Sequence, residues 1–225
     1  MTSEERQTHV NVERDILTAA EAFAREQHSR DSSGHDWWHI ARVRTLAQSI
    51  AREEGADVYV CALAALLHDV ADAKIAGDDA TGQRRVCAWL EAHGVAPDVT
   101  AYVMEIITTM SFAGGNRPPM RTLEGRVVQD ADRLDAIGAI GIARAFAFGG
   151  SRGRAMHDPA ERARTYAGKA EYSASGAATI THFHEKLLLL KDRMNTAYAR
   201  RLAEGRHRYM LAFLDEFAAE WDGER

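Results

Sequence analysis

Cysteine and long apolar runs are both scarce in this chain. The two cysteines, Cys61 and Cys87, lie in apolar helical patterns, which excludes a disulfide framework and indicates reduced thiols in a cytoplasmic protein. The longest apolar run extends from Val58 to Leu67, and a bilayer span needs about 20 residues, so we expect no association with a membrane. The N-terminus is charged and lacks an apolar segment, so we expect no signal peptide.

Neither sign of charge dominates the chain. Its formal net charge of -5 provides no global basic field, which excludes long nucleic acids as expected partners. With 46% hydrophobic and 27% charged residues, the composition is that of a globular protein and excludes disorder as the main state. The 225 residues suit one domain. These patterns do not define an oligomeric state.

Helical periodicity recurs along the whole chain, and no alternating strand pattern bounded by turn residues interrupts it. Only four prolines occur, and alanine, leucine and arginine are abundant, which favours helix. Asp36 is expected to cap the second helix, and Gly205 to divide the last one. The predicted helices cover about 12–28, 36–55, 58–72, 80–93, 97–111, 122–147 and 179–222.

The predicted fold is therefore an all-α single domain that spans 1–225 and contains about seven to nine helices. Its core covers about 12–148, and the C-terminal helices at about 179–222 pack on that core. Between them, residues 149–178 are rich in glycine, serine and charge and have weak periodicity. We interpret this segment as a mobile excursion that acts as a lid.

Two histidines and two aspartates are the strongest candidates for a site. His68 and Asp69 end the most apolar helix, where an imidazole and a carboxylate are costly unless they pair or bind a metal. For His68 and Asp69 alone, a buried histidine–aspartate hydrogen bond is as favoured as metal binding. His39 begins the preceding helix, so antiparallel packing brings it to the same end of the bundle. Asp132, on a third helix, can complete a mixed N/O set that suits Mn²⁺, Mg²⁺, Fe²⁺, Co²⁺ or Zn²⁺.

These residues resemble the H…HD…D pattern of the HD-domain metal-dependent phosphohydrolases. The flanking sequences are similar to the small stand-alone bacterial branch, the YedJ/YpgQ-like proteins: HDWWHIARV, LLHDVADAK, QDADRLDAIGAIGIAR and HFHEKLLLLKDRMNT. The resemblance covers about 35–196. It implies an HD-domain helical bundle, one divalent metal and hydrolysis of a phosphate ester or anhydride, with a small nucleotide as the favoured substrate. Mn²⁺ or Mg²⁺ is the favoured ion.

Several ligand assignments compete. His35 and His39 have the i,i+4 spacing of a zincin helix, but the expected cap at Asp36 places His35 outside the helix. Asp36 itself could bind the metal, but its role as a helix cap is favoured. Asp130 competes with Asp132, and the alanine-aspartate-arginine-leucine motif of the family falls on Asp132. Binuclear relatives use extra histidines after the HD pair; only His93 occurs in that interval, which favours one metal.

Phosphate hydrolysis also needs proton transfer and cations near the metal. Asp72 shares a predicted helical face with His68 and Asp69, so it is the candidate acid or base. The candidate phosphate-binding residues are Lys74, Arg42, His182 and Lys186. For each of these side chains, a solvated surface residue is the alternative. Two other functions compete: a non-catalytic module that binds metal or nucleotide, and an HD-type iron oxygenase.

Overall fold

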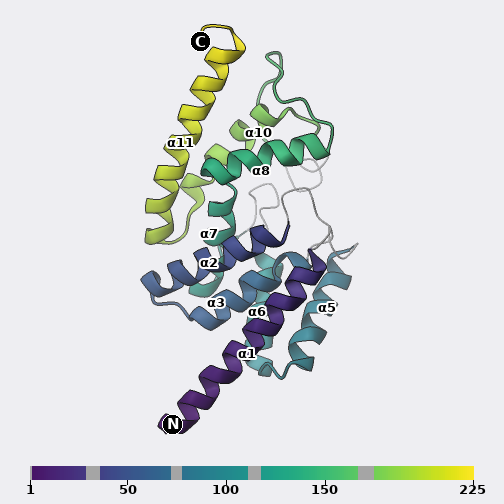
Figure 1. The fold of residues 1–225 in the computed structure, drawn as a ribbon, viewed down its shortest axis with the longest axis vertical. Helices are drawn as coiled ribbons and strands as arrows, with labels where there is room; N and C mark the ends of the chain where they lie inside the picture. Colours follow the sequence, from purple (N-terminus) through teal and green to yellow (C-terminus); the bar gives the residue numbers. More distant parts are fainter. Residues whose placement is uncertain (1, 29–35, 72–77, 111–117, 167–174) are drawn as a thin grey trace. The chain divides into compact units, whose positions relative to one another are not determined.

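The structure is a computed structural model that describes residues 2–28, 36–71, 78–110, 118–166 and 175–225. These residues form nine α-helices and three short 3-10 helices and contain no strand (Figure 1). The all-α fold class is therefore confirmed. The chain forms two compact units, which we describe separately: Met1–Asp31, His35–Ser111 and Met120–Val128 make up the first, and Gln129–Arg225 with two short segments make up the second.

The first unit is built around α3 (Val58–Leu67). Every residue of α3 from Val60 onward is buried, because α1, α2 and α6 pack against it. The neighbouring elements are α1 (Ser3–Gln27), α2 (Trp37–Glu54), η1 (Asp69–Ala71), α5 (Asp79–Ala92), α6 (Pro97–Thr109) and the first turns of α7 (Leu123–Asp135). An apolar surface on all sides is what a central helix requires.

Local capping determines where α2 and α3 begin. Asp36 is the N-cap of α2, and its carboxylate accepts a hydrogen bond from the His39 backbone at 3.1 Å. Gly55, in the left-handed region, ends α2, and Asp57 caps α3 through Val60 at 3.0 Å. These caps confirm the predicted start of the second helix and place His39 in its first turn.

The second unit holds the last part of α7 together with α8 (Gly138–Ser151), α10 (Thr179–Glu185), η3 (Leu187–Leu189), η4 (Lys191–Arg193) and α11 (Ala197–Trp221). Its core contains an aromatic cluster in which Phe146 meets Phe183 and Phe213 at ring-centroid distances of 6.2 and 6.0 Å. Phe217 extends the cluster along α11. The C-terminal helices therefore pack on α8 through large apolar side chains.

Several predicted helix boundaries are wrong, and two of them involve glycines. The helix expected over 122–147 ends at Asp135 and restarts at Gly138, whose φ of 77° is a left-handed conformation that side chains disfavour. Gly205, in contrast, lies inside the continuous helix α11. A helical glycine costs only about 1 kcal/mol, and the buried flanking residues Ala203 and Met210 hold the helix together. The break falls instead before α11, at Met194, which is extended.

The excursion predicted over 149–178 is partly described. α8 continues to Ser151, and an irregular segment follows. Glu161 in that segment accepts hydrogen bonds from the Ala178 backbone at 2.9 Å and the Thr181 hydroxyl at 2.8 Å, which fixes it to α10. The lid role stays a prediction, and 167–174 lie outside the described residues. None of the described helices is both long enough and apolar enough to cross a membrane.

Candidate metal centre

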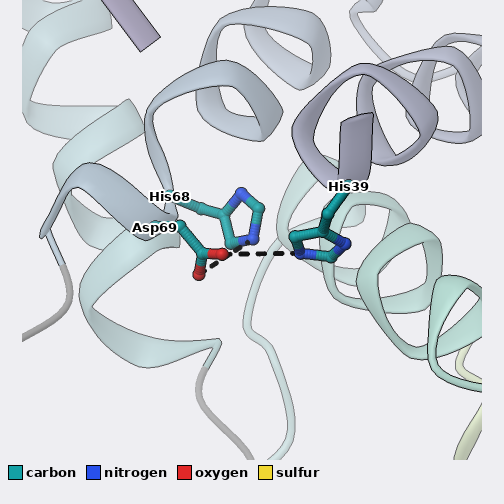
Figure 2. Close-up of side chains that lie close together, drawn as sticks. All are labelled: His39, His68 and Asp69. Carbon is teal, nitrogen blue, oxygen red and sulfur yellow. Dashed lines mark ion pairs between the residues drawn. The ribbon is translucent and has the colours of Figure 1, made fainter. Parts of the chain in front are cut away.

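Three of the four predicted ligands lie together in the first unit (Figure 2). His39 comes from the first turn of α2 and is 1% exposed. His68 is the C-cap of α3 and is 8% exposed. Asp69 begins η1, directly after His68. The antiparallel arrangement inferred from the positions of the two histidines is thus what brings them to one end of the α2–α3 pair.

The Asp69 carboxylate pairs with both imidazoles, as the dashed lines in Figure 2 show. Its Oδ1 is 3.2 Å from His68 Nε2, and its Oδ2 is 3.5 Å from His39 Nε2. The two rings meet edge to face, with centroids 5.5 Å apart. One ligand atom from each residue can be chosen so that all three lie within 4.8 Å of one another. This spacing allows a single small cation to contact all three side chains.

The tautomer of His68 supports metal binding. Its Nδ1 lies 2.8 Å from the carbonyl oxygen of Ala65. A carbonyl oxygen only accepts hydrogen bonds, so Nδ1 carries the proton and the neutral ring has its lone pair on Nε2. That lone pair then faces the Asp69 oxygen, and two acceptors at this distance repel unless a cation or a second proton lies with them. The set of two nitrogens and a carboxylate therefore fits a divalent metal ion.

Close packing of the backbone holds Asp69 in place. Helix α5 packs against η1, and the contact is made at Gly82. A Cβ atom at Gly82 would lie 2.5 Å from the carbonyl oxygen of Ala71, a distance that real Cβ atoms do not tolerate. Glycine is therefore required at this position for α5 to support the 3-10 turn that carries Asp69.

The predicted fourth ligand, Asp132, lies on α7 in the second unit and is half-buried. Its ligand role stays a prediction. Its rival, Asp130, is 0% exposed and accepts hydrogen bonds from Asn195 and Thr196 at 2.8–3.0 Å. Burial raises the pKa of Asp130, and these hydrogen bonds oppose that rise. Both oxygens of Asp130 already accept from protein donors. The preference for Asp132 stays a prediction from the family motif.

The candidate phosphate-binding residues divide between the two units. Arg42 is half-buried on α2, one turn after His39. His182 lies on α10, and Lys186 is its C-cap residue. Burial, followed by the charges of Lys186 and Arg154, lowers the pKa of His182 to about 3. The imidazole is therefore neutral near pH 7 and can exchange hydrogen bonds, while Lys186 carries the charge.

Asp72 and Lys74 lie outside the described residues, so their roles remain predictions. Asp72 would share a helical face with His68 and Asp69 only in one continuous helix over 58–72. Instead, α3 ends at Leu67, and the 3-10 turn Asp69–Ala71 follows. A 3-10 turn has three residues per turn instead of 3.6, which changes the faces that successive side chains share. The shared helical face is thus no longer an argument for Asp72, and only its proximity in sequence remains.

Comparison with known proteins identifies the family. The HD domain matches residues 37–137. The uncharacterized protein YpgQ of Bacillus subtilis is 42% identical over 195 residues, which cover 86% of this chain and 87% of YpgQ. This chain belongs to the HD-domain family. The match includes the three clustered residues His39, His68 and Asp69 as well as Asp132.

Solved structures of HD-family relatives have the same fold. A protein from Lactobacillus plantarum is 40% identical, with 93% of this chain and 98% of that chain covered at a TM-score of 0.84. An HD-superfamily hydrolase from Bacillus thuringiensis is 42% identical, with 93% and 98% covered at 0.74. Bacillus subtilis YpgQ in complex with ADP is 37% identical, with 91% and 97% covered at 0.72. The similarity to the folds of these relatives thus extends over nearly the whole chain.

The sequence did not predict the hydrogen bonds that the residues next to Asp132 form with the segment before α11. Asp130 binds Asn195 and Thr196, and the guanidinium of Arg133 donates to the carbonyl oxygen of Arg193. No spacing rule connects residues so far apart in sequence. The available signal was the isolated Asn195-Thr196 pair before an amphipathic helix, which is typical of an N-cap.

Proposed function

We propose that this protein is a divalent-metal-dependent phosphohydrolase that cleaves a phosphate ester or anhydride of a nucleotide. The observation that carries the proposal is the buried cluster of His39, His68 and Asp69, in which a directed imidazole lone pair faces a carboxylate. Membership of the HD-domain family supports hydrolase chemistry, because a relative at 42% identity is named an HD-superfamily hydrolase. The cluster and the family match both include His39, His68 and Asp69, and the match also covers Asp132.

In the proposal, His39, His68 and Asp69 hold one metal ion, with Asp132 as the fourth ligand. A divalent ion held there supplies Lewis-acid polarisation of a phosphoryl oxygen and lowers the pKa of a water molecule. Two carboxylates in the set favour Mn²⁺ or Mg²⁺, and the two imidazoles also accept Fe²⁺, Co²⁺ or Zn²⁺. The Ala65 carbonyl keeps the proton on His68 Nδ1, so that Nε2 is presented to the ion.

The remaining roles concern protons and phosphate charge. Asp72 accepts the proton of the attacking water or donates one to the leaving oxygen. Lys74, Arg42 and Lys186 bind the phosphate oxygens. His182, which is neutral near pH 7, donates a hydrogen bond to the substrate instead of contributing charge. Lys186 then supplies the cationic contact at this end of α10.

A nucleotide is the proposed substrate because YpgQ, which covers most of this chain, was crystallised with ADP. The net charge of -5 is consistent with a small phosphorylated substrate and not with long nucleic acid. Cys61 and Cys87 are both free, which supports a reducing compartment such as the cytoplasm.

The test is incubation of the purified protein with a panel of nucleoside mono-, di- and triphosphates and Mn²⁺ or Mg²⁺. Ion-exchange chromatography separates phosphate release from pyrophosphate release. His68→Ala should abolish both bound metal and product formation. His9→Ala is the matched control, because His9 is an exposed histidine on α1 and should leave both unchanged.

Failure would take distinct forms. Nucleotide binding with no product from any substrate would establish the non-catalytic module in place of the enzyme. Oxygen consumption that depends on bound iron would establish the oxygenase. Full metal occupancy in His68→Ala would show that the ligand assignment itself is wrong.

A further inference from the structure

The carboxylate of Asp130 forms a buried clasp between α7 and the start of α11, both within the second unit. Oδ1 accepts from the backbone and side-chain nitrogens of Asn195 at 2.9 and 2.8 Å. Oδ2 accepts from the backbone nitrogens of Asn195 and Thr196 at 3.0 and 2.8 Å and from the Thr196 hydroxyl at 2.9 Å. Every contact therefore runs from a donor to the carboxylate, which is the pattern that a buried ionised acid requires.

The clasp also orders the N-terminus of α11. The Thr196 hydroxyl donates its proton to Asp130 and accepts a hydrogen bond from the Ala199 backbone at 3.3 Å, so it serves as the N-cap. The negative charge of Asp130 lies at the positive end of the α11 dipole, which is favourable. Asp130 thus fixes the rotamer of the capping residue and contributes to the stability of the helix start.

Other contacts make the turn before α11 rigid. Gln129 accepts from the Asn195 side chain at 3.0 Å, and Arg133 donates to the Arg193 carbonyl oxygen. Arg200, from α11, donates to the carbonyl oxygens of Met194 and Asn195 at 3.0 Å each. The carbonyl oxygens of the turn accept from these arginines, and its amide groups donate to Asp130. The 193–196 turn therefore provides a stiff support against which α7 packs.

Asp132 belongs to the same turns of α7 but not to the clasp. At 100° per residue, it lies about 200° around the helix from Asp130, so the two carboxylates cannot face the same neighbour. The direction in which α7 presents Asp132 is therefore determined by the rotation and axial position of the helix. The Asp130 clasp fixes both the rotation and the axial position of α7.

We propose that Asp130 is a positioning residue: by locking α7 against the 193–196 turn, it sets the direction in which α7 presents the Asp132 carboxylate. This inference rests on the part of the proposed function that assigns Asp132 as a ligand. Asp130 itself contacts neither the metal nor the substrate, and its effect is exerted through the helix that it anchors.

The decisive measurement is Mn²⁺ affinity by isothermal titration calorimetry, which does not depend on catalysis. Asp130→Asn replaces an acceptor oxygen by an amide that faces donors, so it should break the clasp. We expect its Mn²⁺ affinity to fall about tenfold, the lower end of the effect seen for residues that orient metal ligands. Thr196→Val, which removes one donor, should lower the affinity in the same direction by less.

Asp135→Asn is the matched control. Asp135 is also a buried carboxylate on α7, and it accepts a hydrogen bond from Arg144 at 2.9 Å. This variant should lower the melting temperature while Mn²⁺ affinity stays at the wild-type value. In nucleotide hydrolysis, excess Mn²⁺ should restore the kcat of Asp130→Asn, since its ligands are all present.

The inference is overturned if folded Asp130→Asn binds Mn²⁺ as the wild type does, or if Asp135→Asn loses as much affinity. It also fails if Asp132→Asn has wild-type Mn²⁺ affinity, because then there is no ligand to position. If Asp130→Asn does not fold, Thr196→Val decides: unchanged affinity in that variant refutes the inference. A wild type that binds Mn²⁺ without hydrolysing nucleotides would refute the proposed function, and the weaker binding of Asp130→Asn would still support this inference.

Discussion

The half-buried imidazole of His182 should make the protein sensitive to mild acid in a way that one substitution removes. Burial in α10, with the cations Lys186 and Arg154 nearby, lowers the pKa of His182 from 6.5 to about 3. In the unfolded chain the same imidazole takes up a proton below about pH 6.5. The unfolded state therefore binds more protons, and the stabilising contribution present above that pH is lost as the pH falls from about 6.5 to about 3.

The size of this effect follows from proton linkage. One proton taken up only by the unfolded state changes the free energy of unfolding by about 1.4 kcal/mol for each pH unit. From pH 7 to pH 5, the loss from His182 alone should be about 2 kcal/mol, because the folded state stays neutral over that whole range. His182→Gln keeps a neutral hydrogen-bonding side chain, so it should lose about 2 kcal/mol less than the wild type over this interval.

Urea unfolding of wild type and variant at pH 7 and pH 5, with EDTA present to remove metal linkage, measures the difference. His184→Gln is the control, since His184 is an exposed histidine two residues away on the same helix, and it should keep the wild-type pH dependence. NMR titration of the imidazole gives an independent value. Equal losses in wild type and His182→Gln, or a His182 that titrates near pH 6.5, would refute the reasoning.

Four further changes test the site. Asp69→Ala should lose bound metal and hydrolysis together, as elemental analysis and product assays would show. Asp72→Asn should keep the metal and slow turnover roughly 10²–10⁴-fold; wild-type rates would make it a surface residue. Lys186→Ala should weaken nucleotide binding roughly 10- to 150-fold, the equivalent of a charge-assisted contact of about 1.5–3 kcal/mol, without a change in metal affinity. Gly82→Ala should cost about 1–3 kcal/mol through overpacking against Ala71 and weaken Mn²⁺ binding, and urea unfolding with calorimetry would check both.

The features that sequence reasoning predicted well are those that arise from neighbouring residues. Asp36 caps α2 and Gly55 ends it, because capping depends on a few adjacent backbone groups. The run from Val58 to Leu67 is the central helix, because a helix apolar on every side must be buried. Since those boundaries place His39 at a helix start and His68 at a helix end, their meeting with Asp69 was predictable before any coordinates.

The two glycine positions show where local reasoning stops. Gly205 has the lower helix propensity that predicts a break, yet packing of Ala203 and Met210 keeps α11 continuous. Gly138, within a stretch predicted to be one helix, adopts a positive φ between α7 and α8. A glycine lowers helix stability by about 1 kcal/mol, and the burial of one or two apolar side chains outweighs this cost. Burial depends on residues that are distant in sequence.

The sequence by itself determined the all-α class, both ends of α2, the start of α3 and the identity of the clustered residues, because these follow from periodicity, caps and residue chemistry. Only the tertiary structure decided the states of two side chains. Asp130 became a clasp because Asn195 and Thr196 reach it, and His182 became neutral because its neighbours exclude water from it. Burial and hydrogen bonding between distant segments set these states, and no local pattern in the chain encodes them.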